Sequence, residues 1–195
     1  VERSRGLGDV YKRQVVDAMG GDNAPEEPVK AAVEAVKEKE NIQVILTGVQ
    51  DVIEAELRKY PDYPKDRIRV VHASQVIETA EPPVMAIQKK KDSSIVVGLN
   101  LVKKQEADAF VSSGSTGAVL VGGQVIVGRI QGIRRPPLAP LIPTAKGVSL
   151  LIDCGANVDA RPDHLVQFAQ MGSIYMENVV GIKTVSYTHL TLPTN

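Results

Sequence analysis

The sequence predicts a three-layer α/β/α fold, with a mostly parallel sheet between two layers of helices. Short apolar runs alternate with longer amphipathic segments, which is typical of strands joined by crossover helices. Glycine-rich loops also follow three of the apolar runs. We expect strands at residues 15–18, 43–47, 68–72, 109–112, 140–142 and 148–152. We expect helices at residues 26–39, 52–59, 84–91, 95–104, 118–128 and 163–176.

The first strand–loop–helix unit has the clearest pattern. The strand at 15–18 runs into the Gly20-Gly21 turn, and a helix follows at 26–39. Apolar residues recur at i, i+3, i+4 and i+7 on one face of that helix: Val29, Ala32, Val33 and Val36. This spacing is typical of an amphipathic helix packed on a sheet.

The second half of the chain repeats the pattern with different residues. A short apolar strand at 109–111 precedes a turn rich in hydroxyl groups at 112–117 and a helix of small apolar residues. Gly122 and Gly123 inside that helix each cost about 1 kcal/mol relative to Ala, so we expect close packing there. The run at 148–152 is typical of a strand buried on both faces.

Composition limits the possible functions. The chain has 23 basic and 23 acidic side chains, a balance that argues against nucleic-acid binding. Its one cysteine excludes an internal disulfide and fits a reducing cytosol. No apolar run approaches the ~20 residues of a membrane span. We therefore expect a cytoplasmic protein, with peripheral membrane contact left open.

The two ends of the chain show no pattern that continues the fold. Residues 1–14 and 184–195 resemble translated sequencing-adapter sequence, and disordered termini are the alternative interpretation. We therefore expect one domain at residues 15–183. About 170 residues are enough to bury a core.

Two of the glycine-rich loops have the chemistry of anion sites. Free N–H groups at a helix start attract anions, and glycine lets a ligand approach the backbone. The Gly20-Gly21 turn and the turn at 112–117 both precede predicted helices. The second turn has neither the P-loop lysine nor the dinucleotide-binding order of glycines. Ordinary ligand-free turns remain the alternative.

Other polar residues are further candidates for a site. Asp153 and Asn157 follow the strand at 148–152, where ligands bind in open α/β sheets, although a solvated turn is the alternative. Two basic clusters are either solvated or contacts for an anionic ligand: Lys89, Lys90 and Lys91, and Arg134 and Arg135. The histidines lack metal-ligand spacing, so we expect no metal.

Five segments, in the same order, resemble motifs of the phosphate acyltransferase of bacterial phospholipid synthesis, the PlsX family. These segments are residues 16–25, 85–94, 112–118, 135–140 and 151–157. The resemblance covers most of residues 15–183 and implies the N-terminal portion of a longer enzyme. It implies a fold like that of phosphate acetyltransferases and isocitrate-type dehydrogenases, incomplete here.

The resemblance also implies an activity and partners. The expected reaction transfers a long-chain acyl group from acyl-acyl carrier protein to inorganic phosphate, without a cofactor. The product would feed a membrane glycerol-3-phosphate acyltransferase, and the enzyme would be a homodimer. The basic clusters become contacts for phosphate or for the acidic carrier protein. The residues expected to bind phosphate or substrate are Asp17, Gly20, Gly21, Asp22, Ser113, Gly114, Ser115, Thr116, Gly117, Asp153 and Asn157.

Three alternatives remain open. The scaffold could serve a phosphate acetyltransferase or an NAD-dependent decarboxylating dehydrogenase. It could also be a non-catalytic scaffold that binds the carrier protein. Finally, a truncated chain could be inactive alone. Catalytic residues are not identified by the sequence, because phosphate near neutral pH is already largely a dianion and needs positioning more than deprotonation.

Overall fold

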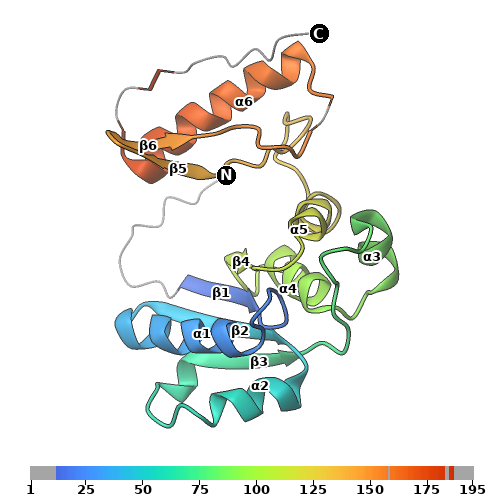
Figure 1. Ribbon diagram of the computed structural model, residues 1–195, viewed down its shortest axis with the longest axis vertical. Helices are drawn as coiled ribbons and strands as arrows, with labels where there is room; N and C mark the ends of the chain where they lie inside the picture. Colours follow the sequence, from blue (N-terminus) through green and yellow to red (C-terminus); the bar gives the residue numbers. More distant parts are fainter. Residues whose placement is uncertain (1–11, 158, 183–184, 187–195) are drawn as a thin grey trace. The chain divides into compact units, whose positions relative to one another are not determined.

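The computed structural model describes residues 12–157, 159–182 and 185–186. The chain divides into two compact units, Val1–Gly128 and Arg129–Asn195 (Figure 1). Most of the two predicted foreign tails lies outside the described residues. Residues 12–14 are described, and they belong to the first strand. The interpretation of the tails stays a prediction.

The first unit contains a four-stranded parallel sheet, as predicted. Its strands are β1 (Lys12–Asp17), β2 (Ile42–Gly48), β3 (Ile68–His72) and β4 (Ala109–Val111). Their order in the sheet is β3-β2-β1-β4. The chain moves outward from β1 to β3 and then returns to the other side of β1. The β1–β4 pair is therefore a topological switch point, where crevices for ligands form in open α/β sheets.

The predicted helices of this unit are found within two residues of their expected ends, with the helix expected at 118–128 made of α5 and the π-helical turn η2 together. They are α1 (Glu26–Glu38), α2 (Gln50–Leu57), α3 (Pro83–Lys89), α4 (Ser94–Lys103) and α5 (Thr116–Gly122). A short 3-10 helix, η1 (Lys65–Arg67), precedes β3, and a π-helical turn, η2 (Gly123–Val127), continues α5.

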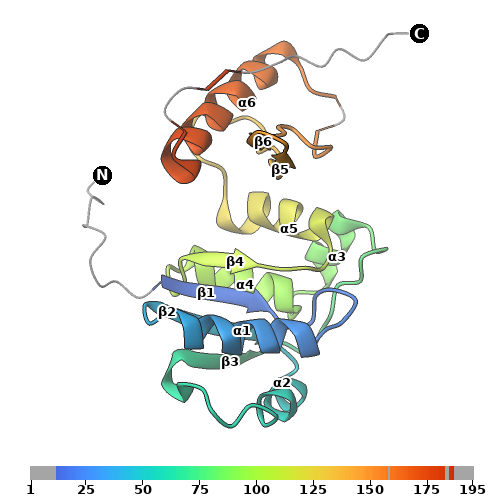
Figure 2. The same cartoon turned by 60° about the vertical axis from the view of Figure 1, so that its left-hand side comes forward.

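Helices cover both faces of the sheet, which confirms the α/β/α layering (Figure 2). The apolar face of α1 packs with α2 against Val44 and Leu46 of β2. Ile45 points to the opposite face, where it packs with Val15 and with Leu101 of α4. Successive strand residues face opposite sides, so β2 contributes to both cores.

Close packing explains one of the two glycines of the α5–η2 helix. A Cβ atom at Gly122 would lie 2.5 Å from Cδ1 of Leu99, so α5 can approach α4 only if this residue has no side chain. At Gly123 a Cβ atom would meet no atom within 4 Å. The expected close packing is found at Gly122, and at Gly123 it stays a prediction.

The segment that follows β3 is held against the turn between α3 and α4. Asp92 accepts hydrogen bonds from the hydroxyl of Ser74 at 2.5 Å and from its backbone N–H at 2.9 Å. These bonds, the hydroxyl first, hold the pKa of the Asp92 carboxyl below its usual value. Lys90 forms an ion pair with Glu81 and donates to the carbonyl of Val76 at 2.6 Å. Both ends of residues 74–81 are thereby fixed.

The second unit contains an antiparallel hairpin and one long helix. Its elements are β5 (Leu141–Thr144), β6 (Gly147–Leu150), α6 (Pro162–Tyr175) and a π-helical turn, η3 (Met176–Val180). The prediction of a strand at 148–152 buried on both faces is wrong. The strand ends at Leu150, its residues are exposed or half-buried, and Leu151 is 40% exposed.

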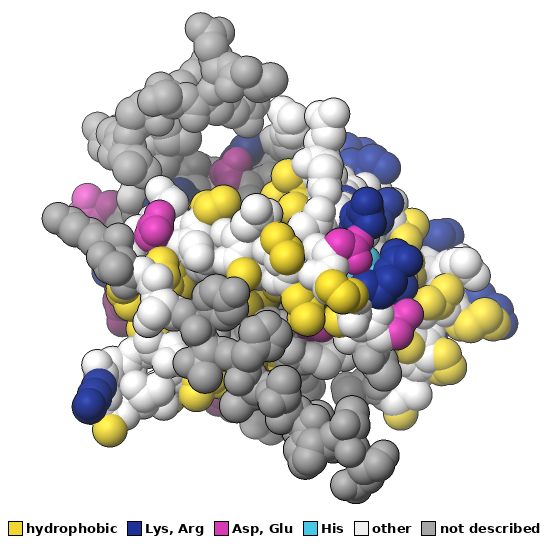
Figure 3. Space-filling model, turned by 90° about the horizontal axis from the view of Figure 1, so that it is seen from above, with side chains coloured by type: hydrophobic (Ala, Val, Ile, Leu, Met, Phe, Trp, Pro, Cys, Tyr) yellow, Lys and Arg dark blue, Asp and Glu magenta, His cyan; other side chains and the backbone are white. Residues whose placement is uncertain are grey.

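Packing within the second unit accounts for this difference. A Cβ atom at Gly172 of α6 would lie 3.4 Å from side-chain atoms of Leu150 and Ile152. The hairpin thus meets α6 on one face only, and a two-stranded ribbon has no second layer among the described residues. Large apolar side chains of α6 and η3 are exposed, among them Val166, Ile174 and Val179. Figure 3 shows hydrophobic side chains interspersed with charged and other side chains on one face of the molecule.

None of the helices in residues 12–182 that the structure describes is long and apolar enough to cross a membrane.

We expect Ile53→Ala to lower the free energy of unfolding by about 2–5 kcal/mol, because Ile53 is 0% exposed in the core between α2 and the sheet. Val52→Ala is the matched control, because Val52 is the neighbour of Ile53 in the chain and its side chain is 40% exposed. Urea unfolding measures both. Equal losses for the two variants would contradict the burial assigned to α2.

We expect Asp92→Asn to lower the stability at pH 7. A carboxyl with a lowered folded-state pKa stabilises the fold above its unfolded-state pKa of about 4 and loses this effect as the pH falls through the folded value. The difference between variant and wild type should therefore shrink below about pH 4. Urea unfolding between pH 7 and pH 3 measures it, with the exposed Asp62→Asn as control. A difference independent of pH would contradict this account.

Candidate functional site

Two of the predicted loops meet at the switch point of the sheet. The β1–α1 loop and the β4–α5 loop leave the same edge, because β1 and β4 are parallel neighbours. A Cβ atom at Gly114 would lie 3.1 Å from the Cα of Gly20, so the two backbones are in contact. The structure therefore brings together the glycine turn and the hydroxyl-rich turn that the sequence singled out separately.

A buried carboxylate joins the two loops. Asp17, at the end of β1, is 2% exposed. Its Oδ2 accepts a hydrogen bond from the Ser112 hydroxyl at 2.8 Å, and its Oδ1 accepts one from the backbone N–H of Met19 at 3.1 Å. The Ser112 oxygen in turn accepts from the N–H of Gly114 at 3.0 Å. Asp17 and Ser112 thus fix the position of one loop on the other.

Ser112 is absent from the predicted site residues. The signal that could have identified it is its place directly after the strand at 109–111, on the neighbour of the strand that ends at Asp17. That neighbourhood depends on strand order, which the sequence alone does not give.

The glycines of the first loop are required by this contact. A Cβ atom at Gly20 would lie 2.5 Å from Asp17 Oδ2 and 2.9 Å from both Gly114 N and Ser112 Oγ. Gly21 has φ +101°, and its Cβ would lie 2.7 Å from Ser113 Oγ. The Ser113 hydroxyl donates to the carbonyl of Gly20 at 2.9 Å, which is a second hydrogen-bonded link between the two loops.

The remaining polar residues of these loops differ in their freedom to bind a ligand. Ser115 is buried, and its hydroxyl caps α5 by accepting from the N–H of Ala118 at 3.3 Å. Thr116 is exposed, and its hydroxyl has no hydrogen bond to another described residue. Asp22 is also exposed and has no ion pair with a described residue.

Helix α3 lies beside the hydroxyl-rich loop. A Cβ atom at Gly117 would lie 2.6 Å from Cγ of Pro83, the first residue of α3. The three lysines at its end are not equivalent. Lys90 pairs with Glu81, and Lys91 donates to the carbonyl of Ile87 at 3.1 Å. Lys89 is exposed and has no polar partner among the described residues.

The other predicted residues lie in the second unit and have polar partners within it. Asp153 accepts from the N–H groups of Leu138 and Asn157, both at 2.7 Å, and from the Asn157 side chain at 3.1 Å. Arg134 pairs with Asp163, and Arg135 with Asp159 at 2.9 Å. The strand before Asp153 does not belong to the parallel sheet, so the argument from a sheet edge does not support it. The roles of Asp153 and Asn157 as ligand contacts stay predictions.

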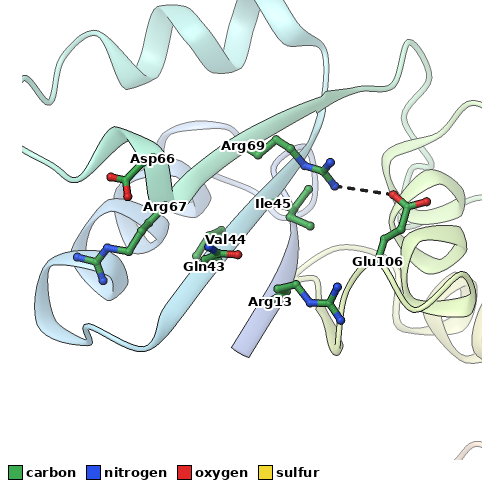
Figure 4. A pocket seen from close by; sticks show the side chains of 8 residues that line it. All are labelled: Arg13, Gln43, Val44, Ile45, Asp66, Arg67, Arg69 and Glu106. Atoms are coloured by element: carbon green, nitrogen blue, oxygen red, sulfur yellow. Dashed lines mark ion pairs between the residues drawn. The ribbon is translucent and has the colours of Figure 1, made fainter. Parts of the chain in front are cut away.

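A pocket of about 390 Å³ lies at the opposite, amino-terminal edge of the sheet (Figure 4). Its lining residues are Arg13, Gln43, Val44, Ile45, Asp66, Arg67, Arg69 and Glu106. The arginines already have partners: Arg13 binds Asp108, Arg67 donates to the carbonyl of Lys39, and Arg69 lies 4.0 Å from Glu106. Each of its three arginines already has a partner, so the switch-point loops remain the better candidate site.

We expect Gly20→Ala to separate the two loops and to lower the free energy of unfolding by about 1–3 kcal/mol, because the added methyl group overpacks a full space. Gly123→Ala is the matched control and should be neutral or stabilising, since its Cβ meets open space. Thermal unfolding measures the stability, and amide chemical shifts of residues 112–117 report loop displacement. Unchanged shifts in Gly20→Ala would contradict the contact.

Comparisons with known proteins agree with this architecture. The family model "Fatty acid synthesis protein" matches residues 13–193. The phosphate acyltransferase of Alkaliphilus oremlandii is 57% identical over 169 residues, which are 87% of this chain and 50% of that protein. The phosphate acyltransferase of Halothermothrix orenii is 50% identical over 171 residues, 88% of this chain and 51% of that protein.

Solved structures support the predicted fold. A phosphotransacetylase from Streptococcus pyogenes has a TM-score of 0.64 and 20% identity, covering 88% of this chain and 55% of that one. The EutD phosphotransacetylase from Staphylococcus aureus has a TM-score of 0.58 and 17% identity, covering 83% and 52%. The expected phosphate acetyltransferase-like fold is confirmed. The chain spans about half the length of the curated relatives it matches, and it belongs to the fatty acid synthesis protein family.

Proposed function

We propose that the protein to which this chain contributes transfers a long-chain acyl group from acyl-acyl carrier protein to inorganic phosphate, and that phosphate binds at the switch-point loops. The observation that carries the proposal is the contact between the glycine turn at Gly20-Gly21 and the hydroxyl-rich turn at residues 112–117. The similar proteins named above are phosphate acyltransferases, which supports the same reaction.

The reaction needs little from the protein beyond placement and charge stabilisation. A phosphate oxygen attacks the thioester carbonyl carbon and forms the new C–O bond, the C–S bond breaks, and the carrier leaves as a thiolate with the electron pair. A thiol with a pKa of about 8.5 departs without a strong acid. Negative charge grows on the carbonyl oxygen, so fixed donors at a dry site lower the barrier. No cofactor is required by this sequence of steps.

The loops supply such donors in our proposal. The Thr116 hydroxyl and the backbone N–H groups of the loops, those of Gly21 and Gly117 among them, are the proposed phosphate contacts. Asp17 is a positioning residue, because both of its oxygens accept hydrogen bonds from the loops. Ser115 holds the start of α5. Asp22 lies at the rim, where solvent screens its charge.

The proposed partners follow from the reaction. The acidic carrier protein would meet basic side chains, and the acyl phosphate product would pass to a membrane glycerol-3-phosphate acyltransferase. A homodimer in the cytoplasm, with peripheral membrane contact, is the proposed assembly. Asp153, Asn157, Arg134 and Arg135 are proposed to contact the substrates.

A phosphate acetyltransferase is the second candidate, because the solved structures with this fold include phosphotransacetylases. A chimera that continues this chain with the C-terminal half of the Alkaliphilus oremlandii relative separates the two. We expect it to form acyl phosphate from a palmitoyl carrier protein and phosphate. Turnover of acetyl donors alone would favour the second candidate, and turnover of neither would contradict both.

We expect Thr116→Val to raise the phosphate concentration for half-maximal rate in this chimera about tenfold, since one hydrogen bond to an anion is worth about 1.5–3 kcal/mol. Thermal stability should not change, because the Thr116 hydroxyl has no described partner. The exposed Thr79→Val is the control. Unchanged phosphate dependence would remove this hydroxyl from the proposed site.

A further inference from the structure

Helix α3 exposes apolar side chains beside the candidate site. Val84 is 54% exposed and Met85 is 46% exposed, whereas Ala86 and Ile87 in the same helix are buried in the core. Large apolar residues at such exposure remain in contact with water unless a ligand covers them. The first turn of α3 therefore presents an apolar surface that the first unit itself does not use.

This surface directly adjoins the hydroxyl-rich loop. Pro83, which precedes Val84, fills the space where a side chain at Gly117 would lie, 2.6 Å from Cγ of the proline. Figures 1 and 2 both show α3 beside α5, the helix that starts from that loop. A ligand on Val84 and Met85 would thus reach toward the residues that are proposed to hold phosphate.

The other end of α3 carries a free positive charge. Lys89 is one turn beyond Met85, and residues four apart share a face of a helix. It has no polar partner among the described residues, whereas Lys90 and Lys91 are engaged by Glu81 and by the carbonyl of Ile87. Met85 and Lys89 therefore lie on one side of α3, and Val84 adjoins Met85 at the end of the helix beside the candidate site.

We propose that this α3 face (Val84, Met85 and Lys89) docks acyl-acyl carrier protein. The acyl chain contacts Val84 and Met85, and the acidic surface of the carrier meets Lys89. This inference rests on the proposed function. It goes further by naming the residues that would bind a carrier with an acyl chain more tightly than a carrier without one. A cationic and apolar surface complements an acidic protein that presents an apolar chain.

The test uses this chain and one bacterial carrier protein, prepared with a palmitoyl group and with the free phosphopantetheine thiol. Isothermal titration at two salt concentrations gives the affinities. We expect Val84→Asn/Met85→Gln to weaken binding of the palmitoyl carrier at least tenfold and to leave the empty carrier within twofold. We expect Lys89→Glu to weaken both carriers at low salt, with a smaller effect at high salt.

Matched controls come from surfaces of similar exposure. Val52→Asn changes an exposed valine in the first turn of α2, and Lys103→Glu changes an exposed lysine in the last turn of α4. Both control variants should bind the two forms of the carrier protein with affinities within twofold of the wild-type values. Thermal unfolding of every variant shows whether the fold is retained.

The outcomes separate this inference from the proposed reaction. Wild-type affinity of the α3 variants, or no binding of either carrier by the wild-type chain, would overturn the α3 face. Normal binding by the wild-type chain without acyl phosphate formation by the chimera would instead count against the reaction. If the control variants weakened binding as much as the α3 variants do, the docking surface would also be overturned. That result would show that the carrier binds exposed apolar or basic residues without preference for α3.

Discussion

The site depends on the hydrogen bond between Asp17 and Ser112. It joins the ends of two strands that are 95 residues apart in sequence and neighbours in the sheet. A buried carboxylate is costly unless donors compensate it, and here a hydroxyl and a backbone N–H do so. Without these donors the buried charge would be unpaired, so the two loops and the carboxylate require each other.

Other features of the first unit follow from the same contact. The glycine at position 20 leaves space for Asp17 and Ser112, and the Ser113 hydroxyl binds the backbone of the opposite loop. Ser115 uses its hydroxyl to cap the start of α5. Several polar side chains of the loops therefore shape the site, and fewer are left to contact a ligand.

The residues predicted for the site separate into three groups for reasons the sequence does not contain. The Thr116 hydroxyl has the expected freedom. The glycines of the two loops are packed against neighbouring atoms, and Asp17 and Ser115 have hydrogen-bond partners. Asp153 and Asn157 lie in the other unit, where they bind each other. The three adjacent lysines also differ, because Lys90 meets Glu81 only through the packing of residues 74–81 on α3. The residue types predicted which side chains could bind an anion. The hydrogen-bond and ion-pair partners decided which of them remain available to a ligand.

The sequence by itself determined the elements of the first unit and its parallel sheet, because apolar periodicity and glycine turns act locally. It also determined the family, through five ordered motifs. Tertiary structure decided the strand order, and hence that the loops after β1 and β4 meet. It also decided that the run at 148–152 becomes one strand of an exposed hairpin. Strand pairing and burial depend on contacts between distant segments, which local patterns do not specify.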